Sequence, residues 1–204
     1  MPEAPAADRF VDLLRHGEAA GGFRLRGSTD DPLTPQGEQQ MRRALAGEPP
    51  WTRIVTSDLQ RCSGFATALA EEFEIPLAVE PRLREIDFGE WEGCEVEALW
   101  ARDAERVTAF WNAPFSVPAP GGEDPQAMCG RVLAAWRALA TALVPGEHAL
   151  VVSHGGPIRV ILGEVLQIPD DALTRIEVAH ASLSRIRLPA GEWPPSLVFH
   201  RPGA

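Results

Sequence analysis

Two short apolar segments of this chain each run directly into a His-Gly pair. Residues 10–17 read Phe-Val-Asp-Leu-Leu-Arg-His-Gly, and residues 150–155 read Leu-Val-Val-Ser-His-Gly. Short apolar runs that end at glycine are typical of buried strands. The sequence therefore predicts two buried strands, far apart along the chain, which present His16 and His154 at their carboxyl ends.

The segments around these strands alternate between helical and strand patterns. Thr34 followed by Pro35 is typical of a helix start and predicts a helix that ends near Leu45. Ser57 and Gln60 have the spacing of a capping box, which predicts the start of a second helix. The other predicted elements are helices at 59–73, 96–111, 124–143 and 157–166 and strands at 53–56, 77–79, 175–178, 182–188 and 197–200.

Strands that alternate with helices predict a largely parallel sheet covered on both faces. We therefore expect an α/β fold, a three-layer α/β/α sandwich with a mostly parallel central sheet. No linker divides the chain, so we expect a single domain over residues 1–204. A helical stripe and a loop with three prolines at 112–122 predict an insertion around 91–124 that covers the site. Ligands of such sheets bind at the carboxyl ends of the strands.

Charge and composition exclude several classes of partner. The 204 residues include 19 Lys and Arg against 29 Asp and Glu, a formal net charge of −10. This balance disfavours nucleic acid and anionic membranes as partners, because both require a basic face. It does not exclude small anionic substrates, since a pocket can be cationic inside an acidic protein.

The cysteines and the hydropathy pattern bear on the compartment. The start of the chain has no basic segment followed by an apolar run, and no stretch approaches the ~20 apolar residues of a membrane span. Cys62, Cys94 and Cys129 are odd in number, widely spaced and without metal-ligand spacing. We expect free thiols in a cytoplasmic protein. We assign Cys62 to packing, because it falls on the apolar side of its predicted helix.

The five histidines separate into two groups. His148 follows Pro-Gly-Glu in a turn and His200 lies near the end of the sequence, so we expect both to be exposed. His180 lies between two predicted strands, and we expect it to lie outside the site. His16 and His154 share a strand-then-glycine setting, which favours a functional role for both.

The segment around His16 has the residues that phosphoryl transfer needs. A neutral imidazole attacks phosphorus, and neighbouring arginines favour the neutral form by charge repulsion. Arg15 is adjacent, and Arg61 lies close to a predicted helix start after a strand, at the same edge of the sheet. Guanidinium groups bind phosphate oxygens bidentately and stabilise the transferring group. Gly17 allows a close turn and leaves backbone N–H groups available to an anion.

A leaving alkoxide also needs a proton donor. Residues 83–93 contain four carboxylates among apolar neighbours. A desolvated carboxyl near a phosphate dianion is pushed towards the protonated form that an acid catalyst requires. Physical reasoning alone leaves four candidates open: Glu85, Asp87, Glu90 and Glu92.

These motifs together resemble the histidine phosphatase superfamily, also called the phosphoglycerate mutase-like superfamily. The similar segments follow the expected order over most of the chain: 14–17 (Leu-Arg-His-Gly), 32–37 (Pro-Leu-Thr-x-x-Gly), 57–61 (Ser-x-x-x-Arg), 83–93 (Leu-x-Glu-x-x-Phe-Gly-x-Trp-Glu-Gly) and 152–156 (Val-Ser-His-Gly-Gly). The resemblance implies that His16 is the nucleophile and that Glu85 is the acid and later the base. It also implies phosphoryl contacts from Arg15, Arg61, His154 and the N–H of Gly155, with no metal and no cofactor.

Within the superfamily the chain is most similar to the α-ribazole phosphatase-like branch. The implied function is a phosphomonoesterase that hydrolyses a small phosphorylated metabolite, α-ribazole phosphate among the candidates, and releases inorganic phosphate. The alternatives are a cofactor-dependent phosphoglycerate mutase and a non-catalytic protein that binds phosphate esters. Ala19 and Gly22 replace polar residues of the usual pattern. Arg24, Arg26 and Ser28 are the candidates to replace the missing contact, and we assign Arg26 as a further substrate contact. Phe115, central in the 112–122 loop, is assigned a substrate-facing role.

Overall fold

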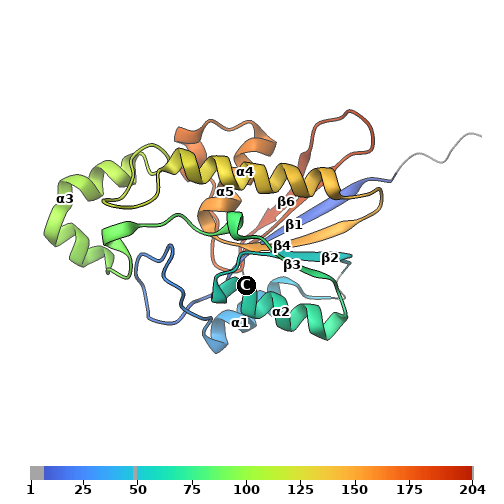
Figure 1. Ribbon diagram of the computed structural model, residues 1–204, viewed down its shortest axis with the longest axis horizontal. Coiled ribbons are helices and arrows are strands. Elements are labelled where there is room, and N and C mark those ends of the chain that lie inside the picture. Colours follow the sequence, from blue (N-terminus) through green and yellow to red (C-terminus); the bar gives the residue numbers. More distant parts are fainter. Residues whose placement is uncertain (1–6, 48–49, 204) are drawn as a thin grey trace, which may run out of the picture.

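Six strands form one mixed sheet with helices on both faces in the computed structural model, which describes residues 7–47 and 50–203 (Figure 1). The strand order is β3-β2-β4-β1-β5-β6; the first four are mutually parallel, β5 pairs antiparallel with β1, and β6 pairs antiparallel with β5. The strands are β1 (Arg9–Arg15), β2 (Arg53–Thr56), β3 (Leu77–Val79), β4 (His148–Ser153), β5 (Leu183–Leu188) and β6 (Ser196–Arg201). The α-helices are α1 (Pro35–Ala44), α2 (Gln60–Phe73), α3 (Val96–Asn112), α4 (Pro125–Ala142) and α5 (Gly155–Leu166).

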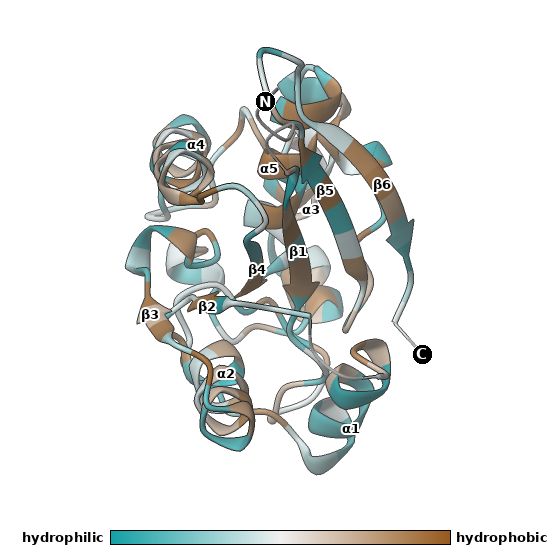
Figure 2. Cartoon of the chain, turned by 90° about the vertical axis from the view of Figure 1, so that its right-hand side faces the viewer, coloured by the Kyte–Doolittle hydropathy of each residue, from teal (hydrophilic) through white to brown (hydrophobic). Residues whose placement is uncertain are grey.

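The predicted α/β sandwich with a mostly parallel sheet is confirmed. Helices α4 and α5 cover one face of the sheet, and α1 and α2 cover the other (Figures 1 and 2). None of the helices in the described ranges is long and apolar enough to cross a membrane. The first six residues, on which part of the secretory-signal prediction rests, lie outside the described residues.

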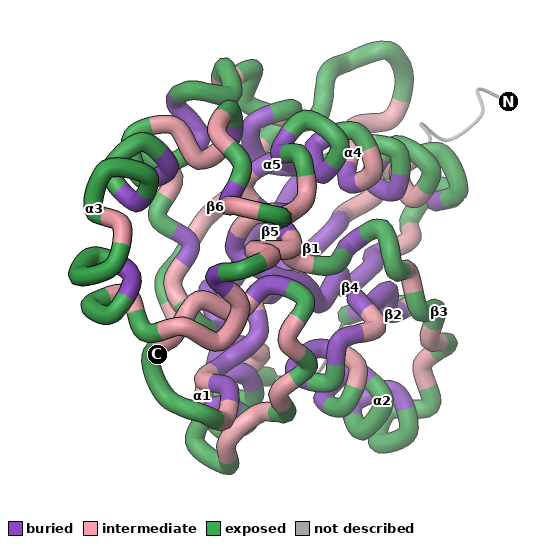
Figure 3. The backbone as a smooth tube through the Cα atoms, turned by 60° about the vertical axis from the view of Figure 1, so that its left-hand side comes forward, coloured by how far each residue is buried: buried purple, intermediate pink, exposed green. Residues whose placement is uncertain are grey.

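The central strands are buried on both faces, and their side chains alternate between two apolar clusters. Val11 and Leu13 of β1 pack in the cluster beneath α4 and α5, whereas Leu14 packs in the cluster over α1 and α2. β4 is buried along its whole length, and β1 is buried from Val11 to Leu14 (Figure 3). Each such side chain contributes about 1.5–3 kcal/mol by leaving water. The ends of β1 and β4 therefore rest on the buried core.

One predicted helix start is confirmed and another is wrong. The Thr34 hydroxyl accepts from the N–H of Gly37 at the start of α1, as expected from the sequence. The capping box from Ser57 to Gln60 is wrong, because α2 begins at Gln60 with no side-chain cap from the preceding residue. Asp30, in a distant loop, accepts from the N–H of Gln60 at 2.6 Å instead. The capping oxygen therefore comes from tertiary structure.

The predicted strand at 175–178 is also wrong. A 3₁₀ helix, η3 (Asp170–Arg175), ends there, and no strand follows before β5 in this described stretch. The Nε of Arg159 donates to the carbonyl of Ile176, and Nη1 of Arg15 donates to the carbonyl of Val178. Arginine side chains therefore satisfy carbonyls that a sheet would otherwise have paired.

The segment between β3 and α4 carries α3 and two short 3₁₀ helices, η1 (Pro81–Leu83) and η2 (Gly89–Trp91). Helix α3 lies beyond the end of the sheet and bends at Asp103, where the backbone leaves helical geometry (Figure 1). A third apolar cluster holds it in place: Trp91, Leu99, Val107, Phe110 and Ala119. This segment has its own small core beside the carboxyl ends of the parallel strands.

Candidate active site

The ends of β1 and β4 bring the two histidines together. The strands pair in parallel with Arg15 opposite Ser153, so His16 and His154 follow at the same edge. The backbone N–H of His16 donates to the carbonyl of Ser153 at 3.0 Å. The two imidazole centroids lie 5.2 Å apart. The convergence predicted from the repeated strand-His-Gly pattern is confirmed.

One ring nitrogen of His16 makes a hydrogen bond to the backbone, and the other has no hydrogen-bond partner among the described residues. Its Nδ1 lies 2.7 Å from the carbonyl oxygen of Gly17. A carbonyl only accepts, so Nδ1 carries the proton and Nε2 keeps its lone pair. Burial, followed by the charges of Arg15 and Arg61, holds the pKa of His16 well below 6.5. The ring is therefore neutral, as attack on an electrophile requires.

His154 is fully buried, and protein groups occupy both of its ring nitrogens. Nδ1 accepts from Nε of Arg61 at 3.2 Å, and Nε2 lies 2.8 Å from the hydroxyl of Ser57. Burial, followed by Arg61 and His16, keeps the pKa of His154 well below 6.5. Contact between this ring and a phosphoryl group would require one of these hydrogen bonds to be exchanged. That predicted contact stays a prediction.

The guanidinium of Arg15 is only partly satisfied. Nη1 donates to the carbonyl of Val178 at 2.6 Å, but the buried Nε has no hydrogen-bond partner among the described residues. Burial is the main cause that lowers the pKa of Arg15, to about 10. Leaving a buried donor unpaired costs about 1–3 kcal/mol. An anion bound here would remove that cost.

Arg61, on the first turn of α2, is completely buried. Nη1 and Nη2 donate to the carbonyls of Thr29 and Gly27, each at 2.7 Å. With Nε donating to His154, one N–H on each terminal nitrogen is left over. Burial lowers the pKa of Arg61, but a guanidinium stays charged in any ordinary solvent. Arg61 therefore ties the 27–29 loop to the histidine pair.

The structure separates the four carboxylates that the sequence left open. Glu92 accepts from backbone N–H groups of Gly27, Ser28 and Thr29 and so anchors the same loop that Arg61 holds. Burial alone would raise the pKa of Glu92, but the hydrogen bonds, led by Thr29, lower it overall. Asp87 accepts from the backbone N–H of Gly89, two residues later in the chain.

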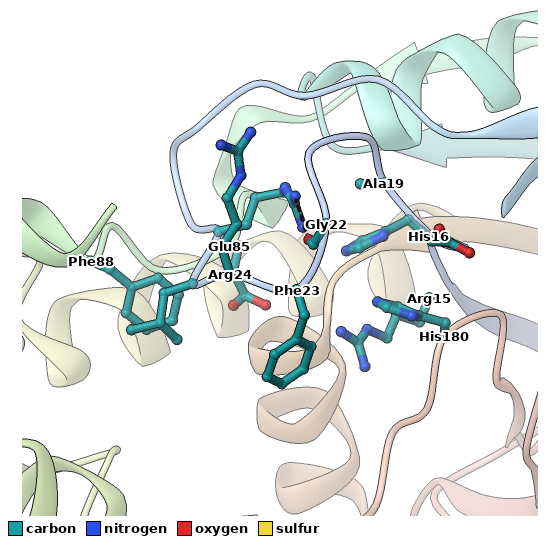
Figure 4. A pocket seen from close by; sticks show the side chains of 12 residues that line it. Arg15, His16, Ala19, Gly22, Phe23, Arg24, Glu85, Phe88 and His180 are labelled. Atoms are coloured by element: carbon teal, nitrogen blue, oxygen red, sulfur yellow. Dashed lines mark hydrogen bonds between the residues drawn. The ribbon is translucent and has the colours of Figure 1, made fainter. Parts of the chain in front are cut away.

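Glu85 is the carboxylate that faces the histidines. Its Oε2 accepts from the N–H of Gly156 at 3.1 Å, and its Oε1 accepts from the N–H of Ile86 at 3.1 Å. Glu85 lines a cavity of about 460 Å³ that also includes Arg15 and His16, whereas the other three carboxylates do not line it. Figure 4 shows the three side chains around this space. The geometry favours the same carboxylate that the resemblance implied.

His180 also lines this cavity, contrary to the expectation that it lies outside the site. Its ring centroid lies 5.4 Å from that of His16 (Figure 4). The sequence signal was weak, because a histidine in a loop between strands has no pattern of its own. The tight connection before β5, where Ala181 adopts a positive φ, places the ring there.

The other two histidines are less exposed than the sequence suggested. His148 is 9% exposed, and its Nε2 lies 3.1 Å from a carboxylate oxygen of Asp12. His200 is partly buried, with Nδ1 against the hydroxyl of Ser184. Both contacts are made across strands, which explains why the local sequence did not predict them.

Gly17 is required for a reason that the sequence did not show. A Cβ at this position would lie 2.1 Å from the carbonyl oxygen of Gly37, so the two backbones touch. The Gly17 carbonyl also orients His16. Gly155 begins α5, and N–H groups in the first turn of a helix have no acceptor within the helix. A bound anion is a suitable acceptor for them.

Arg26 lines the cavity but is already bonded to its own loop. Nε pairs with Asp31 at 2.7 Å, and Nη2 donates to the carbonyl of Ala20 at 2.6 Å. Ala19 is buried and makes a backbone bridge to the segment before α1. Arg26 therefore shapes the loop, and its contact with substrate stays a prediction.

Phe115 is buried and lines a second cavity, of about 380 Å³. Glu85 and Phe88 line both cavities, so the two cavities are adjacent. Cys62 is fully buried in the cluster over α1 and α2, and burial raises the pKa of its thiol. The packing assignment for Cys62 is confirmed.

Comparison with known proteins agrees with this arrangement. Residues 11–199 match the family model described as the histidine phosphatase superfamily, branch 1. The chain belongs to the histidine phosphatase superfamily. The predicted family and fold are therefore confirmed. The described residues contain no group of three or more His, Cys, Asp and Glu side chains arranged to hold a metal ion.

Relatives of this histidine phosphatase superfamily member carry different names. It is 33% identical to the "Probable phosphoglycerate mutase GpmB" of Enterobacter sp. (strain 638), over 90% of this chain and 86% of that protein. It is similar in structure to the α-ribazole phosphatase of Shigella flexneri, with a TM-score of 0.77 and 25% identity over 87% and 89% of the two chains. A mycobacterial glucosyl-3-phosphoglycerate phosphatase gives a TM-score of 0.81 and 25% identity over 96% and 100%.

Proposed function

We propose that the protein is a phosphomonoesterase that hydrolyses a small phosphorylated metabolite through a phosphohistidine on His16. The observation that carries this proposal is a neutral imidazole with a free Nε2 beside an unsatisfied buried N–H of Arg15. A nucleophile and a cationic donor thus face one cavity. The solved relatives named above as phosphatases add support, and one of them was solved with inorganic phosphate.

In the first step Nε2 of His16 forms a bond to phosphorus, and the bond from phosphorus to the ester oxygen breaks. Glu85, protonated before this step, gives its proton to the leaving oxygen, so the alcohol departs neutral. Arg15 stabilises the charge on the phosphoryl oxygens with a preorganised donor. Arg61, His154 and the N–H of Gly155 are the further groups that we assign to the phosphoryl oxygens.

In the second step the Glu85 carboxylate takes a proton from water as the water oxygen bonds to phosphorus. The phosphorus–nitrogen bond breaks, and the electron pair returns to His16. Inorganic phosphate leaves, and Glu85 is protonated for the next cycle. No step needs a metal ion or a cofactor. We also assign the segment around 91–124 as the cover of the site, because its residues line the second cavity next to Glu85.

Phosphoglycerate mutase activity is a second candidate, because the curated relative named above carries that name. A mutase must protect the phosphoenzyme from water and return the phosphoryl group to its product. The two functions differ in the product that receives the phosphoryl group. With ³²P-labelled phosphoglycerates, a phosphatase releases the label as inorganic phosphate and a mutase retains it in an isomer.

The test is hydrolysis of an aryl phosphate at mildly acidic pH by the wild-type protein, His16→Ala and His200→Ala. We expect a large loss in His16→Ala, because the covalent route disappears. His200→Ala controls for loss of a histidine remote from the cavity. Wild-type protein that is quenched in alkali, where a phosphohistidine is stable, should retain labelled phosphate, and chelators should have no effect.

Equal activity in wild-type protein and His16→Ala would overturn the proposal. Binding of phosphate esters without turnover or trapped label would indicate the non-catalytic alternative. A panel of phosphorylated metabolites, α-ribazole phosphate and phosphoglycerates included, ranked by kcat/KM, then identifies the substrate.

A further inference from the structure

The second cavity has an unusual lining for a protein that handles phosphate esters. Its walls are mostly aromatic and apolar: Ile86, Phe88, Phe110, Trp111, Pro114, Phe115 and Met128. One cation, Arg159, joins them. Its volume of about 380 Å³ is within the range of small-molecule sites. Apart from the Glu85 carboxyl, Arg159 is the one ionisable group of this lining, so the cavity favours a ligand with an apolar body and an anionic group.

Glu85 connects this cavity to the proposed chemistry. The carboxyl group lines both cavities, and it is the group that we assign to protonate the leaving oxygen. The leaving oxygen must therefore lie within hydrogen-bond reach of Glu85 when the ester bond breaks. His16 lines the first cavity but not the second. The rest of the departing alcohol then extends past Glu85 into the second cavity.

Arg159 is a partly buried cation without a carboxylate partner. Its Nε donates to the carbonyl of Ile176 at 2.9 Å, and no Asp or Glu oxygen in the described ranges lies within 4 Å of it. Burial lowers the pKa of Arg159, while Glu85 and Glu177 partly oppose that effect. The guanidinium stays charged, and its terminal N–H groups are available to an anion.

Arg159 lies one helical turn after Gly155 on α5, the helix that begins at the histidine pair. A Cβ on Gly155 would lie 3.1 Å from Nη1 of Arg159 and 3.7 Å from Cζ of Arg15. The two guanidinium groups therefore lie close together at the start of α5. Arg15 faces the cavity of the phosphoryl group, and Arg159 faces the cavity of the alcohol.

We propose that the substrate is a phosphate monoester whose alcohol carries an aromatic or broad apolar body and a second anionic group, which Arg159 binds. This inference rests on the proposed phosphatase function and adds the class of alcohol. Arg159 acts as a specificity residue, because it contacts a part of the substrate that does not react. The aromatic side chains of the cavity contribute apolar contact with the body of the alcohol. The charge-assisted hydrogen bond between Arg159 and the second anionic group makes the protein prefer substrates that carry that group.

The test uses pairs of aryl phosphates that differ by one charge. 3- and 4-carboxyphenyl phosphate are compared with 3- and 4-carbamoylphenyl phosphate, which have nearly the same shape without the charge. In wild-type protein we expect kcat/KM to favour the carboxylate by about tenfold in at least one pair. That preference should fall to about one in Arg159→Gln and persist in part in Arg159→Lys.

The two phenols of a pair differ in acidity, and this difference affects every variant alike. Comparing the ratio of the two kcat/KM values between variants therefore removes its effect. Arg137→Gln is the matched control, because Arg137 is exposed on α4 and pairs with Glu164 away from both cavities. Circular dichroism shows whether each variant is folded. The product phenols give a second measurement, as inhibitors that are not themselves hydrolysed. In wild-type protein, 3- or 4-hydroxybenzoate should inhibit more strongly than the corresponding hydroxybenzamide; in Arg159→Gln this difference should be absent.

The outcomes separate this inference from the function on which it rests. If phenyl phosphate is hydrolysed in a His16-dependent manner but every pair gives a ratio near one, the inference fails and the phosphatase function stands. A carboxylate preference that survives in Arg159→Gln also overturns it. If wild-type protein hydrolyses none of the monoesters, both proposals fail.

Discussion

Removal of the Asp12 carboxylate should destabilise the strand that carries the nucleophile. Asp12 is completely buried in the middle of β1. It accepts two hydrogen bonds of 2.8 Å from Arg185 and one of 2.9 Å from Nε1 of Trp51, and Nε2 of His148 lies 3.1 Å away. Four atoms of three side chains thus surround one charge. These contacts join β1 to β5, to β4 and to the segment before β2.

The magnitude follows from what Asp12→Ala leaves behind. Loss of one partner of a buried ion pair costs about 3–5 kcal/mol, because the other charge stays without compensation. The Arg185 side chain is 29% exposed, so water hydrates part of its charge after the change. We therefore expect a loss near the lower limit, about 3 kcal/mol in the free energy of unfolding. That loss lowers the folding equilibrium constant by more than about a hundredfold.

The assay is urea unfolding followed by far-ultraviolet circular dichroism, with Asp8→Asn as the control. Asp8 pairs with Arg187 at the surface, so its loss should have a much smaller effect. A loss below about 1 kcal/mol in Asp12→Ala would refute the reasoning, since an ordinary surface pair has that value.

The pH dependence of this loss has a definite sign. Burial alone raises the pKa of Asp12, but the hydrogen bonds from Arg185 and Trp51, together with the nearby imidazole of His148, outweigh it and lower the pKa overall. A carboxyl whose pKa is lower in the folded state stabilises the fold above its unfolded value, about 3.9. The difference between wild-type protein and Asp12→Ala should therefore be complete at neutral pH and shrink as the pH falls below about 4.

Three further changes test the site. Burial, followed by Arg15, holds the pKa of His16 well below 6.5; Arg15→Gln should move the acid limb of phosphoenzyme formation towards that value, and an unmoved limb would contradict the assigned cause. Gly17→Ala places a Cβ 2.1 Å from the carbonyl oxygen of Gly37. It should cost about 1–3 kcal/mol in urea unfolding, and an unchanged midpoint would show that the backbones separate freely. Phe115→Ala should alter the ranking of aryl phosphates by kcat/KM without abolishing phosphorylation of His16, and an unchanged ranking across the panel would count against a substrate-facing wall.

Much of the fold could be predicted because its signals are local. The apolar runs of β1 and β4 are short and bounded, and Thr34-Pro35 carries its own helix start. The wrong predictions are those in which a residue distant in sequence makes the hydrogen bond that the local sequence pattern assigned to a neighbour. Asp30 caps α2 in place of Ser57, and arginine side chains take the carbonyls around 176–178.

The site was only partly predictable for the same reason. The strand-His-Gly repeat predicted that His16 and His154 meet, because parallel strands end at one edge. His180 lies in the cavity because of a turn whose geometry has no distinctive residue pattern. Arg159 was not identified, because an arginine within a helix is ordinarily a surface residue.

The sequence by itself determined which groups lie at the end of β1: the imidazole of His16, the neighbouring arginine and the glycine after them. Tertiary structure decided which carboxylate faces that imidazole. It placed Glu85 against the N–H of Gly156 and directed Glu92 to the 27–29 loop. The reason is physical. Covalent order fixes which groups stand beside His16 on its own strand, whereas packing between distant segments fixes which groups stand across the cavity from it.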